Sequence, residues 1–470
     1  MPKIGTKIDI NSQEVKNAFR AYDVRGIYGK DLNEEIAERL GKAVGTFLGT
    51  DKNVGVGRDA RLSSPSLHKA LVKGLVAVGC KVIDFGRIPT PVLYFGTWYR
   101  KLSGGVMITA SHLPPEWNGF KITDKTGIIL SEGTGLERIK KMFFNGNFNK
   151  AAVGKVSSDG IINDYVDFVS SKINLKSKFK IIFDFGNSVT SLVVPQVSKR
   201  LKQDAKFINK ELDGTSPNRA SEPSEESLQR LKNKVLESRA DIGIGYDCDG
   251  DRVAFVDEKG RIFTSGNITI PLLAAYMLLQ NPGKKIVYDI TCSSAVGEYI
   301  RKLGGEPIVV RVGHSYCAYG VLKQNALFGG QYSGHTAFPE VNCADDAIFG
   351  SLKILEVMSW SGKKLSELVD DIPSYFTSKM KEIKCDDSLK FDLIEKIKKK
   401  AKSLPYKIID IDGALLFDDE GRVLVRASNT SPIIRVNAEG KTKEICNSFQ
   451  ALGEKLVTEH LNSLKSLCSV

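Results

Sequence analysis

The first part of the chain alternates short apolar runs with amphipathic segments. The runs at 53–59, 81–86 and 104–111 predict strands, and the segment 64–79 predicts a helix between the first two. Strands that alternate with helices indicate crossover connections and a mainly parallel sheet. The pattern therefore predicts an α/β unit in the first third of the chain.

The same order of elements begins again twice. A strand at 180–190 opens a second unit that runs to 240–252, and 285–305 opens a third unit that ends near 326–335. Each unit contains a Gly-rich loop after a late strand, which indicates a weak internal repeat. Because ligands of open α/β sheets collect at the carboxyl ends of strands, we expect these loops to converge on one cleft.

The last hundred residues follow a different pattern. A basic helix at 389–402 precedes short strands with a turn at 418–422, which is typical of a smaller α+β domain. A length of 470 residues agrees with three or four domains in total.

Composition narrows the class of protein without identifying a partner. Hydrophobic and charged fractions of 42% and 26% are ordinary for a globular protein. The longest apolar run, 272–279, is far shorter than the roughly 18–20 residues of a membrane span, and the first residues show no signal-peptide pattern. The eight cysteines are scattered without a CxxC pair, so we expect a reduced, cytoplasmic protein.

The net charge of +12 is compatible with nucleic acid, a membrane surface or phosphorylated small molecules. The most basic run, 395–402, has helical spacing and reads as a solvated helix face. No zinc-finger or RNA-recognition pattern accompanies it. Charge alone does not select a partner, and we expect neither nucleic acid nor a membrane.

Three aspartates alternate in the segment 245–260: Asp247, Asp249 and Asp251. In extended backbone, residues two apart share one face, and three carboxylates so placed repel one another unless a cation neutralises them. Mg²⁺ and Ca²⁺ prefer such oxygen ligands, and Mg²⁺ often shares phosphate oxygens as well. The pattern favours a metal site with a phosphate partner over an acidic surface turn.

An EF-hand begins in the same way and would place Glu258 at loop position 12. The glycine that an EF-hand needs at position 6 is Arg252 here, and the following residues read as a hairpin. We therefore favour magnesium bound outside an EF-hand.

Ser111 and His112 lie side by side in the stretch TASHLPPEWNGFKI, residues 109–122. Neighbours on a strand or a helix point in different directions, so His112 is a poor base for Ser111, and no G-x-S-x-G motif is present. Lys121 lies ten residues further on and can fold back. A serine near carboxylates, a metal and cations suits phosphoryl transfer, although from spacing alone a turn-capping serine is equally consistent.

A second polar segment, RASNTSPIIR, combines hydroxyls, an amide and backbone N–H groups with arginines. Such groups form anion-binding concavities, and an ordinary helix-capping turn is the alternative. Its candidate phosphate ligands are Arg426, Ser428, Asn429, Thr430 and Arg435.

Six segments, in this order, resemble loops of the α-D-phosphohexomutase superfamily in its phosphomannomutase/phosphoglucomutase branch. They are FRAYDVRG (19–26), VGRDARLSS (56–64), TASHLPPEWNGFKI, YDCDGDR (246–252), GGQYSGH (329–335) and RASNTSPIIR (426–435). The resemblance implies an α/β fold of three related mixed-sheet domains plus a C-terminal α+β domain around a central active-site cleft. We place the domains at 1–155, 156–258, 259–373 and 374–470.

The resemblance also implies a phosphohexomutase that interconverts hexose 1-phosphate and hexose 6-phosphate, of mannose or glucose. Ser111 would carry a phosphoryl group, and Asp247, Asp249 and Asp251 would hold Mg²⁺ together with a phosphoserine oxygen. A hexose 1,6-bisphosphate would be the intermediate and activator, and the protein would be a monomer or a homodimer. The other implied catalytic residues are Lys121, His112, Arg25 and Arg252. The implied substrate ligands are Tyr22, Gly313, His314, Gln331, Ser333, Arg426, Ser428, Asn429, Thr430 and Arg435.

Three residues depart from the family pattern. Leu113 replaces an asparagine after the Ser-His pair. Gln331 replaces the glutamate of the family's sugar-binding loop, which GGQYSGH resembles, and Ser431 replaces a glutamate of its phosphate-binding loop, which RASNTSPIIR resembles. Gln331 lacks the charge that would bind two sugar hydroxyls strongly. A phosphosugar-binding protein of the same fold with weak or lost turnover is therefore the alternative function.

Overall fold

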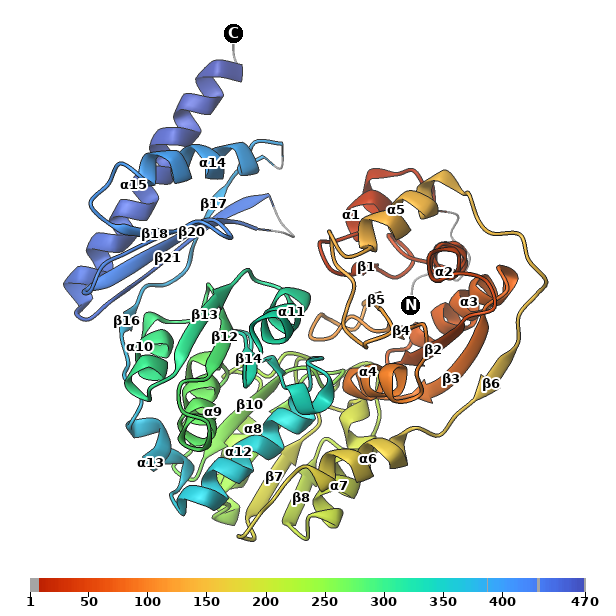
Figure 1. The fold of residues 1–470 in the computed structure, drawn as a ribbon, viewed down its shortest axis with the longest axis horizontal. Helices are drawn as coiled ribbons and strands as arrows, with labels where there is room; N and C mark the ends of the chain where they lie inside the picture. Colours follow the sequence, from red (N-terminus) through yellow and green to blue (C-terminus); the bar gives the residue numbers. More distant parts are fainter. Residues whose placement is uncertain (1–7, 387, 429–431, 469–470) are drawn as a thin grey trace.

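The computed structural model describes residues 8–386, 388–428 and 432–468. Within this part of the chain, four sheets follow one another, and Figure 1 shows them along an arc from the red-orange first domain to the blue fourth domain. Three are α/β domains and the last is α+β, which confirms the predicted fold class.

The first domain contains a six-stranded mixed sheet in the order β1-β5-β4-β2-β3-β6. Its strands are β1 (Val24–Ile27), β2 (Asn53–Arg58), β3 (Lys81–Arg87), β4 (Gly104–Ile108), β5 (Trp117–Thr123) and β6 (Val156–Ser158). Its helices are α1 (Gln13–Ala18), α2 (Glu34–Leu48), α3 (Ser64–Ala77), α4 (Thr90–Tyr99) and α5 (Leu136–Asn145). The strand predicted to reach residue 111 ends at Ile108 instead, because Ser111 adopts a left-handed backbone with φ 52°.

The second domain has the strand order β11-β10-β9-β7-β8, and the third has β13-β12-β14-β15. The second contains α6 (Ile162–Ser171), β7 (Lys180–Asp184), η1 (Val189–Leu192), α7 (Val194–Arg200), β8 (Asp204–Ile208), α8 (Gln229–Ser238), β9 (Ile242–Tyr246), β10 (Val253–Asp257) and β11 (Ile262–Phe263). The third contains α9 (Gly266–Gln280), β12 (Lys285–Asp289), α10 (Ser294–Lys302), β13 (Glu306–Val310), α11 (His314–Gln324), β14 (Phe328–Gly330), β15 (Thr336–Ala337), η2 (Pro339–Val341), α12 (Ala347–Ser361) and α13 (Leu365–Asp370).

The internal repeat is confirmed by strand order. The runs β5-β4-β2-β3, β10-β9-β7-β8 and β15-β14-β12-β13 have the same connectivity, with one antiparallel pair at the same end of each. The loop between that antiparallel pair is 109–116 in the first domain, 247–252 in the second and 331–335 in the third. The serine, aspartate and sugar-loop motifs thus occupy equivalent positions in three copies of one unit.

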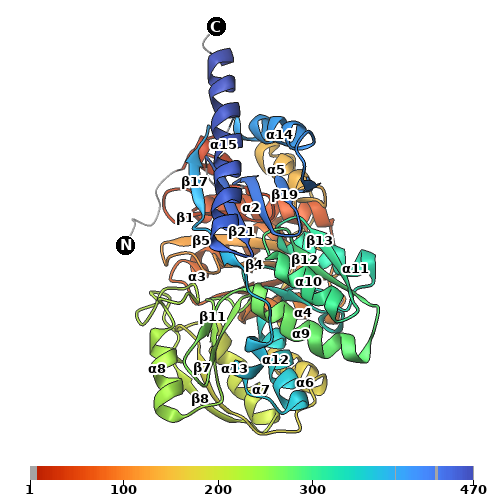
Figure 2. The ribbon, with the colours of Figure 1, turned by 90° about the vertical axis from the view of Figure 1, so that its left-hand side faces the viewer.

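The fourth domain has its own sheet and its own core. Its elements are β16 (Phe376–Thr377), β17 (Lys381–Lys384), α14 (Lys390–Ala401), β18 (Lys407–Ile409), β19 (Ala414–Phe417), β20 (Gly421–Ala427), β21 (Ile433–Gly440) and α15 (Lys443–Cys468). One core cluster extends through the first three domains, whereas the fourth packs around a separate cluster between its sheet and α14 and α15. In Figure 2 the end of α15 projects beyond the rest of the molecule. No helix in the described part of the chain is long and apolar enough to cross a bilayer.

A buried carboxylate ties α6 to the start of α12. Tyr165 donates its hydroxyl proton to Asp346, at 2.9 Å from both oxygens, and Asp346 also caps α12 by accepting from the Phe349 N–H. Burial raises the pKa of Asp346 to about 7. A group whose pKa is higher in the folded state contributes stability at low pH, and this contribution is lost as the pH rises towards the folded-state value.

We expect Asp346→Asn to remove a pH dependence of stability between about pH 4 and pH 7. In that window the wild-type carboxyl lowers the unfolding free energy by about 1.4 kcal/mol per pH unit, because the unfolded chain releases the proton that the folded chain keeps. Denaturant unfolding at pH 5 and pH 8 checks this: the variant should gain stability relative to wild type as the pH rises. Asp204→Asn, which removes an exposed carboxylate, should not show this gain, and parallel curves for Asp346→Asn and wild type would contradict the expectation.

Candidate active site

Ser111 lies where the first and second domains meet, just beyond the carboxyl end of β4. Its Oγ donates to Asp247 Oδ2 at 2.7 Å and lies 3.5 Å from Asp251 Oδ1. The His112 Nδ1 atom is 3.4 Å from Ser111 Oγ, so the prediction that the side chains of Ser111 and His112 point in different directions is wrong. The left-handed backbone at Ser111 is neither strand nor helix, and it turns the two side chains towards each other. Burial, reinforced by Arg252 and Arg25, lowers the pKa of His112 to about 2, so its imidazole is neutral.

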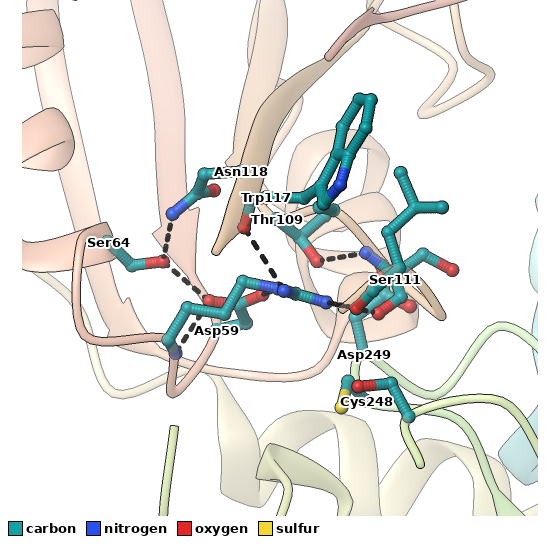
Figure 3. A network of polar contacts seen from close by, with 12 residues as sticks. Asp59, Ser64, Thr109, Ser111, Trp117, Asn118, Cys248 and Asp249 are labelled. Carbon is teal, nitrogen blue, oxygen red and sulfur yellow. Dashed lines mark hydrogen bonds and ion pairs between the residues drawn. The ribbon is translucent and has the colours of Figure 1, made fainter. Parts of the chain in front are cut away.

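The shape of the serine loop is held by Arg61, a residue to which the sequence analysis gave no role. Its guanidinium donates to the carbonyls of Ser111, Leu113, Pro114 and Trp117 at 2.6–3.1 Å. Figure 3 shows this network, in which Asp59 pairs with Arg61 and accepts from Ser64. The segment VGRDARLSS therefore stabilises the conformation of the serine loop through the hydrogen bonds of Arg61.

The three aspartates converge, but not through the geometry expected from the sequence. Residues 247–252 form a turn rather than an extended strand, with Gly250 at φ 82°. Asp247 Oδ1 accepts from the backbone N–H groups of Gly250, Asp251 and Arg252 at 3.0–3.1 Å, which closes the turn. All three carboxylates are buried and offer oxygens within 4.8 Å of one another.

The carboxylate cluster fits a hard divalent cation. Asp249 Oδ1 is buried and has no hydrogen-bond partner among the described residues, which leaves a ligand atom available. Burial and the charges of Asp251 and Asp249 raise the pKa of Asp247 well above its usual range, so the three groups resist simultaneous ionisation without a cation. Glu258, the possible EF-hand ligand, instead accepts from the Ser366 hydroxyl at 2.5 Å.

Lys121 of β5 folds back to the aspartates, as the sequence allowed. Its ammonium donates to Asp249 Oδ2 at 2.7 Å and also contacts Asp251 Oδ2. Burial alone would lower the pKa of Lys121, but the two carboxylates raise it to a net value above the ordinary one. Lys121 is therefore a protonated donor in this arrangement.

Arg25 contributes a second buried cation to the same region. Its Nε donates to Asp23 Oδ2 at 2.6 Å, and its NH1 lies 3.4 Å from the Ala110 carbonyl beside Ser111. Burial opposes its charge, yet Asp23 and other nearby anions raise the pKa of Arg25 further above its ordinary value. The serine thus sits between a cluster of carboxylates and fixed positive charges.

The third domain adds two histidines and a carboxylate that joins them. His314 Nδ1 donates to Asp345 Oδ2 at 2.5 Å, and its ring lies 4.2 Å from that of His335, centre to centre. Arg252 Nε donates to His335 Nε2 at 3.0 Å, so the proton of the neutral ring belongs on Nδ1, which lies 3.7 Å from both Asp251 and Asp345. Burial, reinforced by His314 and Arg252, lowers the pKa of His335 well below its ordinary value.

The sequence analysis missed His335 and Asp345. His335 is the last residue of GGQYSGH, so its motif was recognised without this member, and Asp345 lies in no recognised motif. Tyr22 was predicted, and its ring stacks edge-on against His314 at 5.2 Å. Gly313 has φ 143°, and a Cβ there would lie 3.0 Å from Tyr316 and 3.4 Å from Tyr22.

A cavity of about 480 Å³ lies between the third and fourth domains. Three predicted substrate ligands line it, namely Ser333, Arg426 and Arg435, and Gln331 lies buried beside Ser333 in the same loop. Further lining residues that the sequence did not indicate include the carboxylates Asp289 and Glu439 together with Asn267, Thr291, Thr377, Met380 and Asn437. The volume is in the range of a small-molecule site.

The fourth-domain segment 426–435 is only partly described. Arg426 pairs with Asp412 at 3.1 Å, Arg435 pairs with Glu382 at 3.3 Å, and Lys390 donates to the Ser428 carbonyl at 2.8 Å. Asn429 and Thr430, predicted as phosphate ligands, and Ser431 lie outside the described residues. The arrangement brings Arg426 and Arg435 to the cavity but does not test the rest of the predicted loop.

Three repeated α/β domains and a C-terminal α+β domain, with a serine, a lysine and three aspartates at their junction, define an enzyme of the phosphotransferring isomerase class. Four profiles of the family described as phosphoglucomutase/phosphomannomutase match the chain: alpha/beta/alpha domain I at 16–150, domain II at 163–260, domain III at 265–376 and the C-terminal domain at 380–452. The chain therefore belongs to the phosphoglucomutase/phosphomannomutase family.

Relatives of similar length carry two kinds of name. The chain is 34% identical over 457 residues to a phosphoglucomutase/phosphomannomutase of Thermococcus kodakarensis, covering 94% of this chain and 99% of the relative. It is 35% identical over 456 residues to a "probable phosphoglucosamine mutase" of Pyrococcus horikoshii, covering 95% and 99%. A crystal structure of a family protein from Burkholderia thailandensis superimposes with a TM-score of 0.87 at 29% identity, covering 95% of this chain and 98% of the other.

Proposed function

We propose that this enzyme interconverts hexose 1-phosphate and hexose 6-phosphate through a phosphoserine at Ser111. The observation that carries the proposal is the convergence of Ser111 Oγ, the buried aspartate cluster and the Lys121 ammonium at one domain junction. Phosphoryl transfer depends mainly on positioning and on neutralising charge, and these residues provide both.

In the proposed reaction the phosphoryl group leaves Ser111 Oγ for the free hydroxyl of a hexose monophosphate. The bond from phosphorus to the serine oxygen breaks and a bond to the sugar oxygen forms, while the sugar hydroxyl releases its proton and Ser111 Oγ gains one. Lys121, which shares Asp251 with Ser111, is protonated and placed to stabilise the departing oxygen. The bisphosphorylated sugar then turns within the cleft, and its other phosphate returns to Ser111.

Asp247, Asp249 and Asp251 would hold Mg²⁺ together with an oxygen of the phosphoserine. Bound there, the ion would withdraw charge from the transferring phosphoryl group. Arg25 and Arg252 add fixed positive charge around Ser111, and His112 stays neutral beside it. The aspartates already form a closed turn, so little rearrangement of their backbone is needed.

The cavity between the third and fourth domains would hold the sugar and the phosphate that is not reacting. Arg426 and Arg435 supply the charge for that phosphate, with Ser428, Asn429 and Thr430 as further proposed ligands. His314 lies beside Tyr22, while Gln331 and Ser333 follow β14, so these residues would contact sugar hydroxyls. The separate core of the fourth domain allows it to move as one body, with the proposed domain boundaries at 155, 258 and 373.

We expect the purified protein to convert at least one of glucose 1-phosphate, mannose 1-phosphate and glucosamine 1-phosphate to its 6-phosphate. The assay contains Mg²⁺ and a catalytic amount of glucose 1,6-bisphosphate, and the relative kcat/KM values identify the substrate. Gln331 is the reason to include binding measurements, because a neutral amide anchors hydroxyls less strongly than a carboxylate. Tight binding of a hexose phosphate without conversion of any would reject the mutase and leave the phosphosugar-binding protein.

A further inference from the structure

Two arginines that form no ion pair among the described residues stand side by side at the end of two strands of the first sheet. Arg58 ends β2 and Arg87 ends β3, and the two residues are direct partners across these parallel strands. Neighbouring strands lie about 4.8 Å apart, so the two side chains start close together. Figure 1 shows β2 and β3 on the part of the sheet beyond β4, the strand that leads to Ser111.

Neither guanidinium makes a hydrogen bond or an ion pair within the described ranges of the chain. The nearby carboxylates are engaged elsewhere: Asp84 with His68 Nε2 at 3.0 Å and the Gly86 N–H at 2.8 Å, and Asp59 with Arg61 at 3.1 Å. Burial and the charge of Arg87 lower the pKa of Arg58, and the charges of Asp84 and Asp59 offset this only in part. An anion between the two arginines would relieve this repulsion.

The space in front of the arginines is a cavity of about 350 Å³ between the first and second domains. Its other lining residues are Ala60, Arg61, Leu62, Pro65, Leu212, Asp213 and Gly214. Pro65 lies in the first turn of the fourteen-residue helix α3, whose amino end adds a partial positive charge. The one lining carboxylate, Asp213, accepts from the N–H and hydroxyl of Thr215 in its own turn.

We propose that Arg58 and Arg87 form a second phosphate-binding site, separate from the catalytic cleft, for inorganic phosphate or a small phosphomonoester. Two adjacent guanidiniums match the oxygen geometry of a phosphate group, and the cavity has room for a small molecule attached to it. Arg61, which also lines the cavity, uses its guanidinium for the carbonyls of the serine loop.

The position of the site suggests a consequence for the serine loop, which rests on the proposed function. Residues 59–62 connect the phosphate site to Arg61 and hence to the carbonyls around Ser111. On the other side, Gly214 packs so closely that a Cβ there would lie 2.4 Å from the Ala60 carbonyl. A ligand that joins the ends of β2 and β3 to residues 212–214 would therefore stiffen the support of the serine loop.

The test compares phosphate binding by wild type and an Arg58→Gln/Arg87→Gln double variant. Isothermal titration with inorganic phosphate and, separately, with glucose 6-phosphate should show one more bound equivalent in wild type than in the variant. The catalytic cleft is unchanged in both, so its binding cancels in the comparison. Binding of both ligands to the second site indicates a phosphate site in general, whereas binding of glucose 6-phosphate alone indicates a phosphomonoester site.

A charge-matched variant, Lys176→Gln/Lys178→Gln, removes two exposed lysines before β7 and should bind like wild type. Arg87→Gln alone alters only an exposed side chain, so it preserves the test if the double variant folds poorly. Equal stoichiometry in wild type and Arg87→Gln, or an extra equivalent that is lost equally in the lysine variant, would overturn the proposal. Because binding is measured directly, absence of mutase turnover in wild type would reject the proposed function without deciding this site.

Discussion

Ser111→Ala is expected to lower mutase turnover by at least about 10³-fold, because the variant has no oxygen to carry the phosphoryl group. The fold should survive, since among the described residues the Ser111 hydroxyl is within hydrogen-bond distance only of the active-site groups Asp247, Asp251 and His112. Two measurements check this: the coupled mutase assay, and the intact mass after incubation with glucose 1,6-bisphosphate. Wild type should gain the mass of one phosphoryl group and the variant should not.

The matched control is Ser198→Ala, which removes another buried serine hydroxyl. Ser198 Oγ has no hydrogen-bond partner in the part of the chain that the structure describes, so its loss should leave turnover and phosphorylation unchanged. Retention of more than about a tenth of wild-type turnover by Ser111→Ala, or phosphorylation of that variant at the wild-type level, would show that the phosphoryl carrier is another residue.

Asp249→Asn is expected to weaken Mg²⁺ binding and to lower turnover by at least about 10²-fold. Asp249 Oδ1 is the buried oxygen without a partner among the described residues, whereas Oδ2 already accepts from Thr90 and Lys121. Removal of Mg²⁺ by a chelator should likewise abolish wild-type activity, and added Mg²⁺ should restore it. At an Mg²⁺ concentration of about 100 times Kd, the ion should stabilise wild type by about 2.7 kcal/mol.

Glu258→Gln provides the control for the metal site, because an EF-hand would have used this carboxylate. In the structure Glu258 accepts from Ser366, so its variant should retain wild-type Mg²⁺ affinity even if its stability falls. Calorimetric titration with Mg²⁺ and the thermal midpoint with and without the ion are the readouts. Unchanged Mg²⁺ affinity in Asp249→Asn, or a loss only in Glu258→Gln, would remove the aspartate cluster as the metal site.

The comparison of sequence and structure shows what local patterns reveal. The strands of the α/β units and the hairpin at 252–261 were predictable, because short apolar runs and turn residues are local properties. The equal strand order of the three sheets followed from the repeated order of elements. The length of β4 and the turn at 247–252 were not predictable, since they depend on left-handed residues such as Ser111 and Gly250.

The sequence predicted Ser111, Lys121 and the three aspartates as one site but gave no reason for their contacts. Lys121 bridges Asp249 and Asp251 from another domain, and Arg252 reaches His335 across a further domain boundary. The sequence analysis also missed Arg61 and Asp345, the residues that hold these groups in place. Both residues act through hydrogen bonds to residues far away in the sequence, Arg61 to the Ser111 carbonyl and Asp345 to His314. The apolar periodicity of a sequence carries no information about such distant partners.

The amino-acid sequence by itself determined the repeated α/β units, the order of the six loop motifs and the chemical character of the serine, lysine and aspartate residues. Only the tertiary structure decided which of these groups touch, that His112 faces Ser111, that Asp345 links two histidines, and that Arg58 and Arg87 lie beside a cavity with no ion pair among the described residues. The physical reason is range. Backbone preference and apolar period act over a few residues, whereas hydrogen bonds and charges act between atoms that only the packing of four domains brings within a few ångströms.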